Sequence, residues 1–447
     1  MPFDADPGSA LAELLAHARK AGADAADASL SVRESVSVDV RMGDLEGVER
    51  EEARSIALRA FAGKRQAAAS SSDFSAAGLA ALAERVVAMA KSAPEDPYCG
   101  LLEANLRATD FPNLHTIDSA RPNASELEEL ARRAEAAALA VPEITNSSGA
   151  GASWEAGFAA YATSDGFSGS HEGGAYSLGV TPLAERDGQK ERDYEYRTER
   201  FFADLPSAEE IGRIAGERTI ARLGSRKLES TRAPVIFDRR VSGRIIGPYI
   251  GAISGGAVAR GISFLKDKLG QRVFAEGFAI HENPLKPKGM ASRAFDGEGG
   301  AVKARDLVAD GVLTTWLMNA AAARQLKMQP TGHATLGHGG PPGIGTSNLE
   351  IKPGAQSPAD WMKASGRGLI VTDMFSPSLN ANTGDWSVGV SGHWFENGEA
   401  QFPVSEITVA GNLIEMYARL VAGSDLELRG ALLTPSLFVD DLAIGGL

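Results

Sequence analysis

The sequence predicts an α+β fold in three parts. We expect an N-terminal α/β unit with a β-sheet and two helices, a middle region of helices and β-hairpins, and a mainly antiparallel, barrel- or sandwich-like C-terminal domain. Period-two alternation marks a strand near the N-terminus, Ser-x-x-Glu patterns mark helix starts, and Asp-Gly or Asn-Gly pairs mark hairpin turns. The expected boundaries are 1–95, 96–228 and 229–447.

The N-terminal unit begins with an amphipathic helix over 8–21, which we expect to end at Gly22. In the segment SLSVRESVSVDV, residues 29–40, apolar and polar residues alternate, and only Glu34 is out of step. This alternation is typical of a half-buried strand. The elements expected next are strands over 55–63 and 65–72 and a helix over 75–91.

The middle region is predicted to hold two helices that flank a set of hairpins. Capping boxes mark the helix starts, and Pro or Gly marks the ends. The expected elements are a linker over 93–122, a helix capped by Ser125 and Glu128 that ends before Pro142, hairpins over 143–200 with a turn at Asp187–Gly188, and a helix capped by Ser207 and Glu210 that ends near Gly224.

From residue 232 onward the pattern is mostly β. Asp310–Gly311 and Asn397–Gly398 are strong signals for two-residue hairpin turns. The expected strand segments are APVIFD (233–238), GVLTTWLMN (311–319), GLIVTDMF (368–375), the long run 386–411 and SLFVDDLAIGG (436–446).

Composition narrows the class of protein. A chain of 447 residues with 43% hydrophobic and 23% charged residues is ordinary for a globular protein. Its net charge of −13 argues against a nucleic-acid partner. Cys99 is the single cysteine, the N-terminal segment MPFDADPGSALAELL lacks the pattern of a signal peptide, and no apolar run approaches the ~20 residues needed to span a bilayer. We therefore expect a soluble cytoplasmic protein without membrane contact.

Two His-Glu pairs begin like the helical zinc motif H-E-x-x-H, but neither completes it. His171–Glu172 is followed by two glycines, and His281–Glu282 is followed by Pro284, which would break the helix. Both pairs therefore fit surface loops or hairpins better. The glycine-rich segments lack the ending of a P-loop, and no G-x-S-x-G elbow is present.

A resemblance emerges from the C-terminal third. The segments AFDGEGGAVKARDLVADGVLTTWLMNAAAARQLKMQPTGHA (294–334), NLEIKPG (348–354), GLIVTDMF and NANTGDWSVGVSGHWFENGEAQFPVSEITVAGNL (380–413) resemble the TldD/PmbA family, a peptidase family of the modulator of DNA gyrase type. The likeness is closer to its PmbA branch, also called TldE. Weaker likeness extends through the rest of the chain.

The resemblance implies a specific change at one helix. The TldD branch is a metalloprotease that carries H-E-x-x-x-H on a helix, with a thiolate near the C-terminus. Alignment through the strand PVIFD places Gly247 and Ala252 at the histidine positions and Pro248 at the glutamate position. None of these can ligate a metal or move a proton. Local residues favour a helix with Gly247 as its cap and Pro248 first, so we expect a catalytic helix kept as scaffold without its chemistry.

Two functions follow as hypotheses. In the first, the chain is the non-catalytic subunit of a heteromeric protease, has no cofactor of its own, and pairs with a TldD-like partner that holds the zinc. The resemblance implies unfolded peptide substrates such as modified microcin precursors and an antitoxin, held as an added strand at a C-terminal sheet edge. The residues expected at that edge are Asn380, Thr383, Gly384, Asp385, Ser391, Gly392, Pro403 and Glu406.

In the second hypothesis, the chain is a self-sufficient homo-oligomeric metallopeptidase. Its metal would then be held outside the family motif, by His333 and His338 in a glycine-rich stretch together with the distant His393. The metal content of the isolated chain separates the two hypotheses. A direct action on DNA gyrase is a weaker third idea, because the acidic chain shows no basic stripe.

Overall fold

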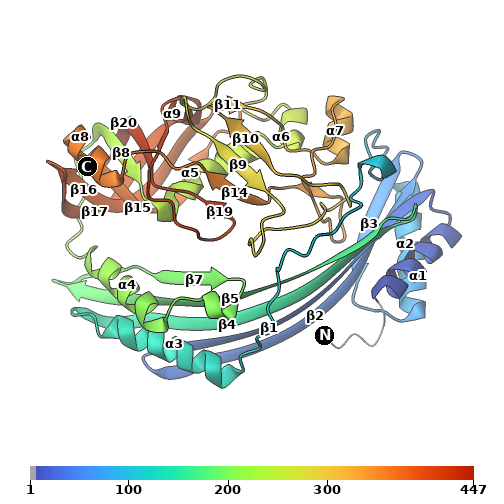
Figure 1. Cartoon of the computed structure of the whole chain (residues 1–447), viewed down its shortest axis with the longest axis horizontal. Coiled ribbons are helices and arrows are strands. Elements are labelled where there is room, and N and C mark those ends of the chain that lie inside the picture. The colour runs from blue at the N-terminus through green and yellow to red at the C-terminus, as the bar shows by residue number, and fades with distance from the viewer. Residues whose placement is uncertain (1–6) are drawn as a thin grey trace.

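The computed structural model describes residues 7–447 in two halves, a long curved sheet with its helices and a compact C-terminal half above its concave face (Figure 1). The first six residues, part of the segment that lacks a signal-peptide pattern, lie outside the described residues. No helix of residues 7–447 is both long and apolar enough to cross a membrane.

The N-terminal half is built on one antiparallel sheet of seven strands. Its order is β3-β2-β1-β4-β5-β6, and β7 also pairs with β5. The strands are β1 (Ala25–Arg41), β2 (Asp44–Ala62), β3 (Arg65–Ser71), β4 (Ile144–Thr163), β5 (Ser168–Arg186), β6 (Gln189–Arg192) and β7 (Glu195–Glu199). Because β1 pairs with β4 from Asp27 to Val40, the expected boundary near residue 95 falls between two parts of one continuous sheet.

Two helix pairs cover one face of this sheet. The helices are α1 (Pro7–Lys20) and α2 (Ala76–Ser92) at one end, and α3 (Ala124–Leu139) and α4 (Ala208–Ile220) at the other, with short 3₁₀ turns η1 (Ala104–Leu106) and η2 (Phe202–Asp204). Leu30 packs under the first pair and Val38 under the second. Glu34, the residue out of step, lies between the two apolar clusters and pairs with Arg50 at 3.3 Å. The alternation therefore reports burial by two separate helix pairs.

The cap of α3 differs from the expectation. Asn123, not Ser125, is the N-cap: its side chain accepts from the Glu126 backbone N–H at 3.1 Å, and the Glu126 carboxylate accepts from Asn123 N–H at 2.7 Å. The capping box thus begins two residues earlier, since Asn serves as well as Ser at this position. The Ser207 cap of α4 is confirmed, and that helix ends at Ile220.

The C-terminal half contains a closed five-stranded barrel, β17-β16-β15-β8-β20, closed by pairing of β17 with β20. Only the β8–β15 pair in the ring is parallel. The strands are β8 (Thr231–Phe237), β15 (Arg367–Leu379), β16 (Asp385–Glu396), β17 (Glu399–Asn412) and β20 (Leu437–Gly445), with β18 (Val421–Ala422) beside β20.

A second five-stranded sheet and short helices complete this half. The sheet runs β11-β10-β9-β14-β19. The strands are β9 (Ile280–Asn283), β10 (Arg305–Ala309), β11 (Val312–Leu313), β14 (Asn348–Ile351) and β19 (Leu432–Leu433), with a separate pair β12 (Ala334–Thr335) and β13 (Gly343–Ile344). The helices are α5 (Arg239–Ala252), α6 (Gly255–Ala259), α7 (Ala320–Leu326), α8 (Pro358–Ser365) and α9 (Leu413–Ala418).

The three predicted hairpin turns are confirmed. Both residues of Asp187–Gly188, Asp310–Gly311 and Asn397–Gly398 have positive φ, as type I′ turns require. The expected strand over 311–319 is wrong beyond Leu313. Its C-terminal end turns instead into the start of α7, where the Asn319 side chain accepts from Ala322 N–H at 2.9 Å.

Candidate functional site

The helix at the degenerate motif, α5, begins earlier than the sequence predicted. Asp238 follows strand β8 and caps the helix, its side chain accepting from Arg240 N–H at 2.9 Å. Pro248 therefore lies inside α5 and not at its first position. Because proline has no N–H, it cannot bond to the carbonyl four residues back, and burial of the helix's apolar face holds the helix together instead.

The three motif positions do not form a metal site. Gly247 is exposed and Ala252 is buried, and five residues turn an α-helix by roughly 140° from one face to another. Gly247 also precedes Pro248, where a Cβ would crowd the proline ring in a helical conformation. These residues have no side-chain donor, so they do not fit zinc. Nowhere in the described part of the chain do three or more His, Cys, Asp or Glu residues gather in a way that suits a metal.

A cavity of about 260 Å³ lies beside α5, and we call it the α5 cavity. Its walls come from α5, from strand β7 with the residue before it, and from the segment 427–434. Tyr194, Tyr196, Thr198, Arg239, Arg240, Gly243, Arg244, Glu427, Arg429, Gly430, Leu432 and Thr434 line it. The segment 427–434 thus meets the degenerate helix here, across from the N-terminal sheet.

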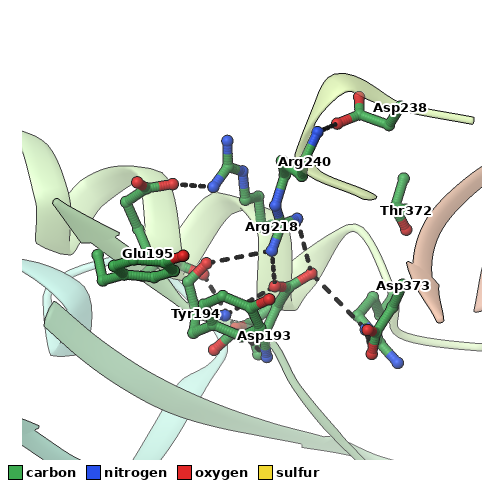
Figure 2. Close-up of polar contacts among 12 residues, drawn as sticks. Asp193, Tyr194, Glu195, Arg218, Asp238, Arg240, Thr372 and Asp373 are labelled. Atoms are coloured by element: carbon green, nitrogen blue, oxygen red, sulfur yellow. Dashed lines mark hydrogen bonds and ion pairs between the residues drawn. The ribbon is translucent and has the colours of Figure 1, made fainter. Parts of the chain in front are cut away.

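Buried ion pairs connect the two halves beside this cavity. Asp193, 4% exposed, binds Arg240 of α5 at 2.5 Å (Figure 2). Glu195, 1% exposed, contacts three guanidiniums, those of Arg197, Arg218 and Arg429. Such pairs stabilise one geometry because breaking them would leave a buried charge uncompensated.

Further contacts extend this network. Arg197 also pairs with Glu427 at 2.5 Å, and Glu427 pairs with Arg239 at 3.0 Å. Burial lowers the pKa of Arg218, and the nearby charge of Arg240 lowers it further. Positive charge is therefore crowded around the α5 cavity, which makes it suited to an anionic group.

Four of the expected peptide-binding residues gather in the turn between β15 and β16. Asn380 N–H bonds to the Asp385 carbonyl at 2.9 Å, and Gly384 N–H bonds to the Asn380 carbonyl at 2.8 Å. The Thr383 hydroxyl donates to the Asp385 carboxylate at 2.7 Å, and Asn412 donates to that carboxylate at 3.0 Å. These hydrogen bonds stabilise the turn, so they explain the Asn, Thr, Gly and Asp residues of this segment without a bound peptide.

The other four lie elsewhere on β16 and β17. Ser391 is buried, and a Cβ on Gly392 would meet the Ile370 carbonyl at 1.8 Å. Pro403 faces His393 in the β16–β17 ladder, and Glu406 pairs with Lys227 at 2.9 Å. β16 is paired on both sides, and β17 pairs with β20 over residues 408–410, so these stretches offer no free edge for an added strand. Peptide binding by the eight residues stays a prediction.

The structure does not bring the three candidate histidines together. His333 is buried and meets Glu282 at 2.6 Å, whereas His338 meets Ser55 of β2 at 2.6 Å. His393 bonds to the Ala221 carbonyl at 3.0 Å. Glu282 is 2% exposed and also accepts from Ser347 N–H at 2.6 Å, so its expected surface position is wrong. These bonds with His333 and Ser347 hold the pKa of Glu282 below its usual value despite burial.

The arginines of the α5 cavity were not among the site residues predicted from the sequence. The arginines that line it come from DRRVSGR (238–244) and DLELRG (425–430), and a third distant segment, DYEYRTER (193–200), supplies its tyrosines and the neighbouring Arg197. In each segment at least one acid and one arginine lie within a few residues of each other, which is a usable signal. Only the tertiary structure shows that the three meet around one cavity.

Family models cover most of the chain. The PmbA/TldA metallopeptidase domain 1 matches residues 26–90, the central domain matches 117–223, and the C-terminal domain matches 230–446. The chain is 36% identical to metalloprotease PmbA of Escherichia coli O157:H7, over 95% of this chain and 92% of that protein. It is 35% identical to the Haemophilus influenzae PmbA homolog, over 96% and 94% of the two chains.

Solved structures agree in fold. A Bacteroides thetaiotaomicron protein named as a modulator of DNA gyrase superposes with a TM-score of 0.92 at 25% identity, over the whole of both chains. TldE from Thermococcus kodakarensis has the same fold, with a TM-score of 0.85 at 18% identity over 98% of this chain and all of that one. With its three domains matched in order, this chain belongs to the PmbA/TldD metallopeptidase family.

Proposed function

We propose that this chain is the non-catalytic, PmbA/TldE-like subunit of a two-component metalloprotease that degrades or processes unfolded peptides. The observation that carries the proposal is helix α5. It keeps a buried apolar face, and the resemblance places Gly247, Pro248 and Ala252 at the positions where the TldD branch has its two histidines and its glutamate. A TldD-like partner would supply the zinc and the general base.

The packing of α5 supports a retained scaffold role. Tyr249, fully buried, donates from its hydroxyl to the Leu307 carbonyl at 3.2 Å. Tyr417 donates to the Ile245 carbonyl at 2.9 Å. Because a helix held by such contacts keeps its position without metal ligands, loss of the motif leaves the architecture available for binding.

The proposed substrates are extended peptides, including modified microcin precursors and antitoxins. A net charge of −13 disfavours nucleic acid as the partner. Since the C-terminal barrel is closed, a peptide strand would add to the N-terminal sheet, where β7 pairs only with β5 in the described residues and borders the α5 cavity. We place this complex in the cytoplasm, and we propose that the chain forms a homodimer when the partner is absent.

The test is peptide cleavage by the chain alone, by a TldD-type partner alone and by the mixture. We expect the isolated chain to be inactive and the mixture to cleave an unstructured peptide in a chelator-sensitive way. A partner in which the motif glutamate is replaced by Gln should give an inactive mixture, because the general base is then lost.

A control separates the competing hypothesis. The variants His333→Ala, His338→Ala and His393→Ala should leave cleavage by the mixture within about twofold if folding is preserved. Chelator-sensitive cleavage by the isolated chain that disappears in these variants would contradict the proposed function and favour a self-sufficient enzyme.

A further inference from the structure

Guanidiniums outnumber carboxylates around the α5 cavity. Three carboxylates, those of Asp193, Glu195 and Glu427, are shared by six guanidiniums. These belong to Arg197, Arg218, Arg222, Arg239, Arg240 and Arg429. Arg222 also contacts the acids Glu191 and Asp373. The cavity is therefore cationic in a chain whose overall charge is −13.

Arg244 adds a further positive charge that no acid balances. It lines the cavity from the exposed side of α5, and its Nη1 donates to the Met374 carbonyl. Within residues 7–447 no carboxylate lies within ion-pair distance of its guanidinium. A guanidinium presents five donors in a planar fork that matches a carboxylate, so Arg244 retains donors for a ligand.

Two tyrosines orient the neighbouring arginines. The rings of Tyr194 and Tyr196 stack with centroids 6.0 Å apart. The Arg240 guanidinium lies 5.1 Å from the Tyr194 ring centroid, and that of Arg429 lies 4.3 Å from the Tyr196 ring centroid. Stacking occupies the faces of these groups and leaves their N–H edges to bind acceptors. Tyr196 is 49% exposed, so it also offers apolar contact to a bound residue.

A larger cavity of about 590 Å³ adjoins this one and shares Tyr194 and Tyr196 with it. Its lining differs in charge, because it contains Asp39, Glu46 and Glu49. A carboxylate is therefore favoured on the α5 side, and neutral or basic residues are favoured in the adjoining space. The two neighbouring cavities therefore favour peptide residues of opposite charge.

We propose that the α5 cavity binds a carboxylate of an extended peptide, with Arg244 as the direct contact and the adjoining acidic cavity taking neighbouring residues. This rests on the proposed function, which supplies the peptide. The carboxylate is either the peptide's C-terminus or an Asp or Glu side chain, and both present the same planar pair of oxygens to the guanidinium.

The test measures binding by the isolated chain, without any cleavage. The probe is the peptide GSKAGSAL labelled at its N-terminus with a neutral BODIPY dye, which has no carboxylate. It is prepared with a free C-terminal acid, as the amide, and as an amide carrying Glu in place of its last residue. Fluorescence anisotropy gives each Kd. The variants are Arg244→Gln and, as a matched control, Arg213→Gln, which removes an exposed arginine of α4.

We expect a carboxylate-bearing peptide to bind about tenfold more tightly than the plain amide, the order of one charge-assisted hydrogen bond. Arg244→Gln should abolish this difference, and Arg213→Gln should preserve it. The tighter of the acid and the Glu amide identifies the source of the carboxylate. Equal binding of all three peptides, no binding of any, or equal losses in both variants would overturn the inference.

Failure of the carboxylate site and failure of the proposed function can be told apart. If the mixture with the partner cleaves peptides but the isolated chain shows no carboxylate preference, the inference is wrong and the subunit role stands. If the chain binds the acid through Arg244 but the mixture is inactive, the subunit role is wrong and the carboxylate site stands.

Discussion

The N-terminal half spreads its apolar residues over one face of an open sheet, whereas the C-terminal half encloses them within and around a closed barrel. In the first, small residues such as Ala and Val pack under two separate helix pairs. In the second, one cluster contains Phe237, Tyr249, Phe274 and Tyr417. Open edges therefore remain in the N-terminal half, and rigid positioning of α5 comes from the C-terminal half. The α5 cavity lies between strand β7 of the open sheet and helix α5 of the C-terminal half.

The largest effect should follow from damaging the C-terminal core. Tyr249→Ala removes a fully buried ring that packs edge-on against Phe274 with centroids 5.0 Å apart. We expect it to lower the free energy of unfolding by about 4 kcal/mol. Tyr249→Phe removes only the hydroxyl and should cost about 1 kcal/mol. Urea denaturation of both variants measures the difference, and similar losses would show that the ring is not a packing centre.

The junction between the halves comes next. Glu195→Gln leaves three guanidiniums without their shared buried carboxylate, so we expect a loss of about 3 kcal/mol of stability. Glu427→Gln changes a half-exposed partner and should cost less than about 1 kcal/mol. Thermal unfolding checks both variants. A small effect of Glu195→Gln would mean that the two halves are held together by other contacts.

The contact between the halves should also make stability depend on pH. Burial raises the pKa of Glu298 to about 7, with a further increase from the charges of Asp296 and Asp27. The folded protein therefore keeps this proton at pH values where the unfolded chain has lost it, and stability from Glu298 falls as pH rises toward 7. The loss should be about 2 kcal/mol between pH 5 and pH 7.

Glu298→Gln isolates this contribution, because Gln is neutral and can still accept from Ala320 N–H, which now binds the carboxylate at 2.8 Å. Denaturation at pH 5 and pH 7 should show this loss in the free energy of unfolding for the original protein and not for the variant. Parallel behaviour of the two proteins would contradict the raised pKa.

Two glycines, one in each half, test how tightly the helices are packed at those positions. A Cβ at Gly212 of α4 would lie 2.1 Å from the Ala134 carbonyl oxygen, whereas no atom lies within 4 Å of one at Gly251 of α5. Gly212→Ala should therefore destabilise by about 1–3 kcal/mol. Gly251→Ala should stabilise by about 0.5–1 kcal/mol. Thermal unfolding measures both effects. If the melting temperatures of both variants change in the same direction, close helix packing is not the reason for glycine at position 212.

Local sequence patterns predicted individual strands and turns better than they predicted which strands pair. The alternation over 29–40 and the Asn397–Gly398 turn act over a few residues, so both could be predicted from the sequence. Pairing of Asp27 with Thr163 joins residues far apart in the chain, and no local pattern encodes it. Closure of the barrel through Ala410 and Ala443 could not be predicted for the same reason, so the sequence did not show that this part of β17 has a partner on each side.

At the candidate site, the sequence itself shows that Gly247, Pro248 and Ala252 have no metal-binding or acid–base side chain, wherever they lie. That a catalytic motif once stood there stays a prediction. The cationic cavity depends on contacts such as Arg240 with Asp193, which form only when β7, α5 and the C-terminal segment come together.

Zinc content of the isolated chain, measured by elemental analysis after incubation with zinc and removal of the excess, tests the central claim most directly. We expect less than about 0.1 zinc per chain, because four-coordinate sites need ligands that the motif positions of α5 do not provide. In a mixture with a TldD-type partner, the amount of bound zinc should follow the amount of the partner and should not increase with added chain. One zinc per isolated chain, retained through dialysis, would contradict the proposal that this chain is a subunit without a metal site.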